Sequence, residues 1–388
     1  MRFSRGGRWF LPVAVFALAV GVWGAALVLR TARAGERFDF VRWEIEALPG
    51  KTLYALGAPF RAGPPGQTDL GAYFDETDRS SPLARRLENA VEAVIEARIA
   101  AVLAEQGIHW PPVDFELAAS PRVLIVSPRT RIERIVDDPL RPDLTTADVE
   151  RIEAAAERDR TQSALVVRTG GVATYPAIVL EGGDYRETVS AAAHEWAHHY
   201  LTFHPLGRAY FASADARTIN ETVADIVGDE VAHIVVERWG LPARPGQASA
   251  PPPAAPAAPA APVPPRPGAV DAAQALRALR LDVDALLTVG RVEDAERRMA
   301  AVREELAAAG IRYRRINQAF FAWTGSYAAR ADAVDALGGQ LRALRARAGS
   351  VARFLAAVQP LRTRAEVARV APPPATEPEQ EEPEQEEP

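Results

Sequence analysis

The spacing of apolar and polar residues through the middle of the chain changes period several times. Helical periodicity predicts helices at about 81–106 and 146–158, and short apolar runs predict strands at 122–126, 164–168 and 172–180. The glycines at 170 and 171 predict a turn that joins the last two strands. This order of elements predicts an α+β fold with a small sheet.

Two low-complexity segments divide the second half of the chain. Residues 243–268 are nearly all Pro and Ala and predict an extended linker, and residues 371–388 are rich in Pro, Glu and Gln and predict a disordered acidic tail. Helical periodicity returns between them, so residues 269–370 are expected to form a helical subdomain. This part is either the second wall of a cleft or a separate binding module, and we favour the wall.

The pentad His194-Glu195-Trp196-Ala197-His198 is the strongest chemical signal in the chain. On a helix the two histidines lie one turn apart on one face, so both imidazoles can reach one metal ion. Glu195 is then placed to take a proton from a metal-bound water. The spacing therefore predicts a zinc-dependent peptide hydrolase, and the absence of cysteine disfavours a closed structural zinc site.

The third metal ligand has two candidates, His204 and Glu221. His204 completes a spacing that resembles the metzincins, which have a glycine midway where this chain has Leu201. A leucine tolerates positive φ poorly. Metzincins also carry a methionine turn below the metal, whereas the methionines here are Met1 and Met299. Glu221 is therefore favoured.

Glu221 and Asp225 lie one turn apart in the run Asn-Glu-Thr-Val-Ala-Asp, on a predicted helix at 218–239. With the pentad, this run resembles the gluzincins, the thermolysin-like clan, over residues 188–230. The resemblance implies a zincin-like catalytic domain with one Zn²⁺ per chain on His194, His198 and Glu221. It further implies Glu195 as general base and Asp225 as the carboxylate that orients a ligand imidazole.

The same resemblance implies how the substrate is held. The strand before the active-site helix is an exposed edge that pairs with an extended peptide, and Pro176 suits an edge strand. A downstream residue stabilises the developing oxyanion, and Tyr327 is our candidate. Gluzincin aminopeptidases resemble one another in a Gly-x-Met-Glu-Asn run. The counterpart at 171–175 has no acid, so an endopeptidase is favoured unless another segment supplies the amino-terminal anchor.

Composition excludes some partners and adds one. The chain of 388 residues has a net charge of −6 and no basic stripe, which argues against nucleic acid. Residues 9–29 form an uncharged apolar run long enough to span a bilayer, flanked by arginines, and predict a membrane anchor within residues 1–34. A cleaved signal peptide is the alternative. We expect a single-pass membrane protein with residues 35–242, the catalytic domain, outside the cytoplasm.

These patterns lead to one favoured function, a membrane-anchored zinc metallopeptidase that acts on proteins or peptides. An inactive peptide-binding or scaffolding protein with a zincin fold is the alternative. A metal-dependent hydrolase of a non-peptide bond is also open, because metal chemistry alone does not name the scissile bond. The oligomeric state and the physiological substrate are not predicted.

Overall fold

The computed structural model describes residues 35–47, 67–242 and 270–371, except 329 and 332. The predicted membrane anchor, the Pro/Ala linker and the acidic tail beyond residue 371 lie outside the described residues. Within the described ranges, no helix combines the length and the apolar character needed to cross a bilayer.

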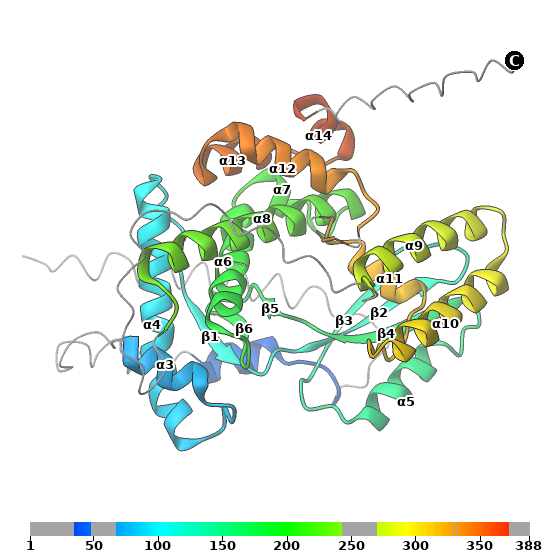
Figure 1. Cartoon of the computed structure of the whole chain (residues 1–388), viewed down its shortest axis with the longest axis horizontal. Helices are drawn as coiled ribbons and strands as arrows, with labels where there is room; N and C mark the ends of the chain where they lie inside the picture. Colours follow the sequence, from blue (N-terminus) through cyan, green and yellow to red (C-terminus); the bar gives the residue numbers. More distant parts are fainter. Residues whose placement is uncertain (1–34, 48–66, 243–269, 329, 332, 372–388) are drawn as a thin grey trace, which may run out of the picture.

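The described chain is a mixed α+β structure, as predicted, with many helices and two small sheets where one was expected (Figure 1). Residues 40–47 are helical. The strands that follow are β1 (Phe115–Ala118), β2 (Arg122–Pro128), β3 (Val136–Leu140), β4 (Gln162–Arg168), β5 (Gly171–Val172) and β6 (Ala177–Leu180). The helices up to residue 242 are α3 (Gln67–Asp75), α4 (Pro82–Glu105), α5 (Thr146–Ala156), α6 (Tyr185–Thr202), α7 (Pro205–Arg208) and α8 (Ala214–Trp239). Those after residue 269 are α9 (Ala272–Thr288), α10 (Val292–Ala308), α11 (Gln318–Thr324), α12 (Leu337–Ala348), α13 (Val351–Val358) and α14 (Arg364–Val370).

The strands form two three-stranded sheets. The first has the order β3-β2-β4 and is antiparallel; the second has the order β1-β6-β5, with β1 parallel and β5 antiparallel to β6. The strands predicted at 164–168 and 172–180 lie in different sheets, because β4 pairs with β2, and β5 pairs with β6. The Thr174 N–H donates to the Val172 carbonyl at 2.8 Å, and this turn divides the predicted strand into β5 at the edge and β6 at the centre.

Alternating apolar residues of β2 pack on both faces of the first sheet. Leu124 and Val126 join a core with α5, whereas Val123 and Ile125 face α11. Helices α9 and α10 pack together in a core of their own, to which Phe321 of α11 contributes. The first sheet is thus covered by a helix from each half of the chain.

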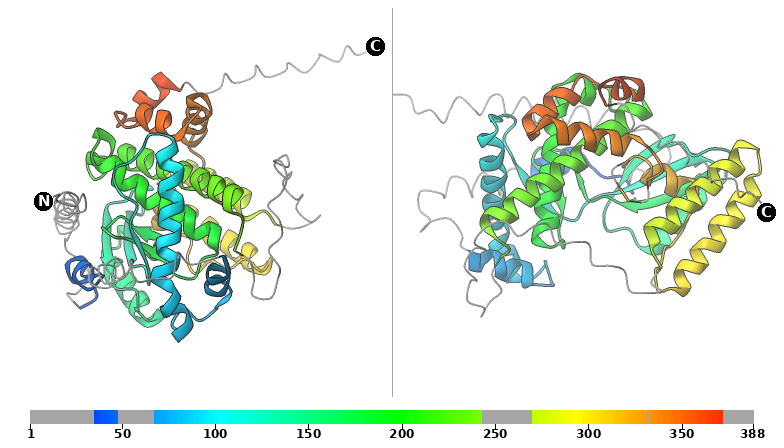
Figure 2. Two further views of the ribbon diagram at one scale, coloured as in Figure 1. Left: turned by 90° about the vertical axis from the view of Figure 1, so that its left-hand side faces the viewer. Right: turned by 45° about the horizontal axis from the view of Figure 1, so that its top comes forward.

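The largest core lies between the long helices. It joins α4, α6 and α8 to β1 and β6 and also includes buried side chains of α12, α13 and α14, such as Leu341 and Phe354. Figure 2 shows these C-terminal helices, orange to red, beside the green α7 and α8 from other sides. Residues from 337 onward therefore stabilise the helices that carry the candidate site.

Candidate metal site and cleft

The two motif helices cross at close range beside the predicted ligands. Gly228 of α8 allows this approach: a Cβ at this position would lie 2.6 Å from the Ser190 carbonyl oxygen and 3.2 Å from the His194 Cβ. Any larger residue would push the helices apart. The crossing brings Glu221 and Asp225 of α8 against the histidines of α6, which begins with an Asp184–Glu187 capping box.

Three predicted ligands converge at this crossing. The Nε2 atoms of His194 and His198 are 3.0 Å apart, and they lie 3.6 and 3.7 Å from the Glu221 Oε2. Tetrahedral zinc with bonds near 2.0–2.1 Å places its ligand atoms about 3.3 Å apart. The donor set and its spacing fit a metal ion, and within the described residues this is the group of His and acid side chains that could hold one.

A second set of side chains orients the ligands. The Nδ1 of His194 lies 3.0 Å from the Asp225 carboxylate, and the Nδ1 of His198 donates to the Asn220 amide oxygen at 2.6 Å. The Tyr210 hydroxyl donates to the Glu221 Oε1. These bonds leave both Nε2 atoms facing the centre.

Of the three side chains that orient the predicted ligands, the sequence predicted a role for Asp225 only. The signal for Asn220 was its place directly before the glutamate ligand. Tyr210 lies in an irregular loop with no motif around it.

The histidines and Glu221 shift one another's pKa values. Burial lowers the pKa of His194, but bonds to Asp225 and Glu221 outweigh burial and raise it well above its ordinary value. Burial raises the pKa of Glu221, but His198 and His194 outweigh it and hold that pKa well below its usual range. The protein alone therefore favours an imidazolium–carboxylate cluster, and a divalent cation would take the place of its protons.

Glu195 lies beside the cluster and against the edge strand β5. It is 5% exposed, and burial raises its pKa. A Cβ on Gly171 would lie 2.3 Å from the Glu195 Oε1, so a side chain at this strand position would displace the carboxylate. The predicted general base thus borders the edge strand β5.

The predicted Tyr327 reaches the same cleft from the other half of the chain. It lines a cavity of about 1090 Å³ together with the three ligands and Glu195. The Ala328 N–H donates to the Thr222 hydroxyl at 3.1 Å, which fixes this segment to α8 beside the glutamate ligand. Burial, followed by the charge of Glu221, raises the pKa of Tyr327 well above its ordinary value, so its phenol stays a donor.

Sequence reasoning missed another part of this wall. The Trp323 ring lies 5.5 Å from the Tyr327 ring, and the Arg134 guanidinium lies 4.7 Å from the centre of the Trp323 ring. Arg134 also pairs with Asp137. Arg134 adds a positive charge to this side of the cleft, which no local motif indicated.

The remaining histidines of interest lie outside the ligand group. His204 precedes α7 and stacks on Tyr200, with ring centres 4.7 Å apart. His199 is buried, donates from Nε2 to the Thr174 carbonyl at 2.6 Å, and has a pKa lowered to about 4 by burial. His199 therefore anchors the turn after β5 to α6.

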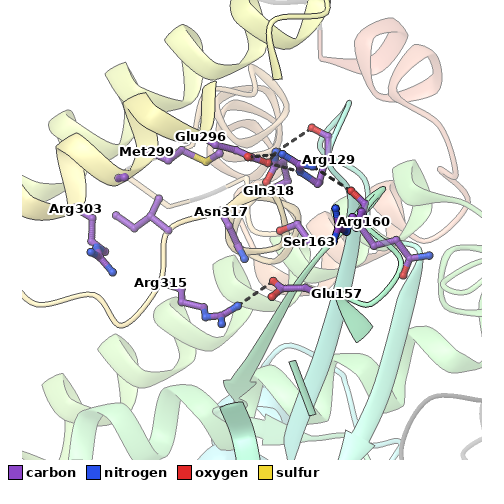
Figure 3. A pocket seen from close by; sticks show the side chains of 13 residues that line it. Arg129, Glu157, Arg160, Ser163, Glu296, Met299, Arg303, Arg315, Asn317 and Gln318 are labelled. Atoms are coloured by element: carbon purple, nitrogen blue, oxygen red, sulfur yellow. Dashed lines mark hydrogen bonds and ion pairs between the residues drawn. The ribbon is translucent and has the colours of Figure 1, made fainter. Parts of the chain in front are cut away.

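A second cavity of about 460 Å³ lies between α10 and the β4 side of the first sheet (Figure 3). Arg129 binds Glu296 through two bonds of 2.7 and 2.6 Å, and Arg315 binds Glu157 at 2.9 Å. Two arginine–glutamate pairs thus link separate elements across this cavity, which Arg160 and Arg303 also line.

Comparisons with protein-family models, curated proteins and solved structures found no match for this chain. The evidence for function therefore lies in the geometry of the site.

Proposed function

We propose that this protein is a zinc-dependent metallopeptidase with a zincin-like catalytic part of the gluzincin type. The observation that carries the proposal is the convergence of His194, His198 and Glu221, with Glu195 beside them, in a large open cleft. Two imidazoles and one carboxylate suit zinc, which in catalytic sites takes three protein ligands and keeps one position open. Zinc supplies Lewis-acid chemistry, because it acidifies water and polarises a carbonyl oxygen.

Glu195 accepts the proton of the attacking water and passes it to the leaving amine. Its burial favours this role, because a carboxylate with a raised pKa holds a proton more readily between the two steps. The Tyr327 phenol donates a hydrogen bond to the negative charge that develops on the carbonyl oxygen. These roles need no covalent intermediate with the protein.

The edge strand β5 binds the peptide in an extended form. Its pairing with β6 occupies one side, and the residues from Gly170 to Thr174 line the cleft on the other. Backbone hydrogen bonds to a strand edge hold a peptide irrespective of its sequence. This supports a peptide substrate over a small ester, and we further propose that the predicted anchor at 9–29 holds the enzyme at a membrane.

A peptide library incubated with the zinc-loaded protein tests this function. The unmodified protein is expected to cleave internal bonds. Glu195→Gln should retain one zinc per chain and lose about 10²- to 10⁴-fold in rate, since only the general base is removed. Zinc bound without cleavage of any peptide by the unmodified protein would favour the inactive peptide-binding alternative.

A further inference from the structure

The amino-terminal described segment forms part of the cleft. Residues 36–38 extend the first sheet beside β3: the Phe38 N–H donates to the Pro139 carbonyl at 3.1 Å, and the Arg141 N–H donates to the Glu36 carbonyl at 2.9 Å. The helix at 40–47 follows directly, drawn in blue in Figure 1. Its residues Phe40 and Glu44, one turn apart, both line the cleft.

The Glu44 carboxylate has two different oxygen environments. It accepts a hydrogen bond from the Tyr175 backbone, in the loop between β5 and β6. Its Oε1 is buried and has no hydrogen-bond partner among the described residues. Burial raises the pKa of Glu44 to about 7, which reflects the cost of a charge without a counterion.

The other acids that line the cleft are engaged, apart from the proposed base Glu195. Asp225 and Glu221 serve the histidines. Asp137 pairs with Arg134, and Asp229 accepts from the Ser190 hydroxyl at 3.1 Å. Glu187 closes the capping box of α6.

Glu44 and Glu195 are therefore the acids of the cleft for which no side-chain partner is found among the described residues. Burial favours the protonated form of such a carboxyl, and a cation that enters the cleft would favour its charged form instead.

We propose that Glu44 binds a positively charged group of the substrate, either a lysine or arginine side chain or a free amino terminus. The inference rests on the proposed peptidase function and names its substrate class. Tyr175 lies three residues after β5, so the carboxylate is held next to the edge strand that would carry the peptide. Glu44 thus supplies from a distant segment the acid that the sequence at 171–175 lacks.

Peptide binding tests this role without turnover. The zinc-loaded, full-length Glu195→Gln protein is titrated with two sets of peptides in a calorimeter. One set is acetylated at the amino terminus and carries lysine, or uncharged norleucine, at each position in turn. The other compares free with acetylated amino termini on a lysine-free peptide. Charged peptides are expected to bind about tenfold tighter in at least one set, as a charge-assisted hydrogen bond contributes.

Matched variants assign the preference to Glu44. Glu44→Gln keeps an acceptor for the Tyr175 N–H but removes the charge. It should reduce the ratio of affinities for charged and uncharged peptides to about one, while the affinity for the norleucine peptides stays the same. Glu46→Gln removes the same charge from the outer side of the helix, where Glu46 is 62% exposed and pairs with Arg42, and should retain the preference. The peptide set in which Glu44→Gln abolishes the preference tells whether a side chain or an amino terminus is bound.

No preference in either set, or a preference that survives Glu44→Gln, would overturn the inference. Cleavage of the same peptides by the protein with Glu195 intact tests the peptidase function separately. A peptidase without Glu44-dependent preference would refute the inference alone, whereas Glu44-dependent binding without cleavage would refute the peptidase function alone.

Discussion

The cleft and the cavity beside α10, both formed by described residues, are lined with charged side chains that are arranged differently. In the cavity beside α10, arginines and glutamates from separate elements neutralise one another, as in the Arg129–Glu296 pair. In the cleft, imidazoles and carboxylates converge on one point, with three donor atoms within 4.8 Å of one another. Paired charges hold structural elements together, whereas converging donors favour a cation that the chain does not supply.

The largest effect is expected from removal of one of the three donor side chains that converge in the cleft. Glu221→Ala is expected to lose its stoichiometric zinc, because two imidazoles on one helix turn are an incomplete ligand set. His204→Ala removes a histidine that stacks on Tyr200 and should keep one zinc per chain. Elemental analysis of the two variants beside the unmodified protein measures this, and the opposite result would assign the third ligand to His204.

Loss of the phenol on the far wall should leave the metal in place and lower the rate. Tyr327→Phe is expected to reduce kcat by about 10²- to 10³-fold with little change in KM, because the phenol acts on charge that develops during the reaction. Tyr313→Phe is the matched control, since Tyr313 packs in the separate core of α9 and α10. Steady-state kinetics on one cleaved peptide decides, and equal rates for both variants would rule out the proposed role.

A smaller effect should follow from loosening a ligand without removing it. Asp225→Ala is expected to weaken zinc binding by about 10- to 100-fold, because the His194 ring loses the carboxylate that orients it. Asp229→Ala, one turn further along α8, removes an acid that bonds to Ser190 and should leave zinc affinity unchanged. Competition with a chelator of known affinity compares them. Equal affinities would show that Asp225 does not tune the site.

A substitution in the cavity beside α10 should have the smallest effect on stability and no effect on zinc binding. Glu296→Gln is expected to lower the free energy of unfolding by about 0.5–1 kcal/mol, because the pair is one-third exposed and solvent screens it. Zinc content should not change. Chemical denaturation at neutral pH measures the difference, and loss of zinc in this variant would mean that the two cavities are coupled.

The same pair also predicts a pH dependence. The hydrogen bond from Arg129 holds the pKa of Glu296 below its ordinary value of 4.5. The folded state therefore binds this proton less readily than the unfolded state, so the stabilisation is fully present above pH 4.5. It should disappear as the pH falls through the lowered pKa. Unfolding curves of the unmodified protein and Glu296→Gln should accordingly converge in acid.

Local patterns predicted much of the fold around the site. The helices at 82–105 and 146–156 and the strands at 122–128 and 162–168 match the predicted ones within a few residues, and Ser81 caps the first helix. Each depends on periodicity or a capping residue within its own segment. The edge strand was misjudged, because the Thr174–Val172 turn that separates β5 from β6 overrides a continuous apolar run.

In the candidate site, too, some residues could be predicted from local spacing and others could not. The spacing of His194, Glu195 and His198 places them on one helix, and the spacing of Glu221 and Asp225 places them on another, so both sets are visible in the sequence. Tyr210 and Arg134 carry no motif, and only the packing of loops against α8 and α11 brings them to the cleft. Their contacts in the cleft therefore follow from tertiary packing and not from a local sequence pattern.

By itself, the sequence determined which side chains are available for the proposed chemistry, because a helical repeat of 3.6 residues suffices to align two histidines and place Glu195 beside them. Only the tertiary structure decided what surrounds them. The crossing at Gly228 joins the ligands, the bond between Ala328 and Thr222 carries Tyr327 across, and the sheet extension at 36–38 brings Glu44 to the edge strand. These contacts join segments far apart in the chain, and long-range packing depends on the shape of the whole core, which no local pattern contains.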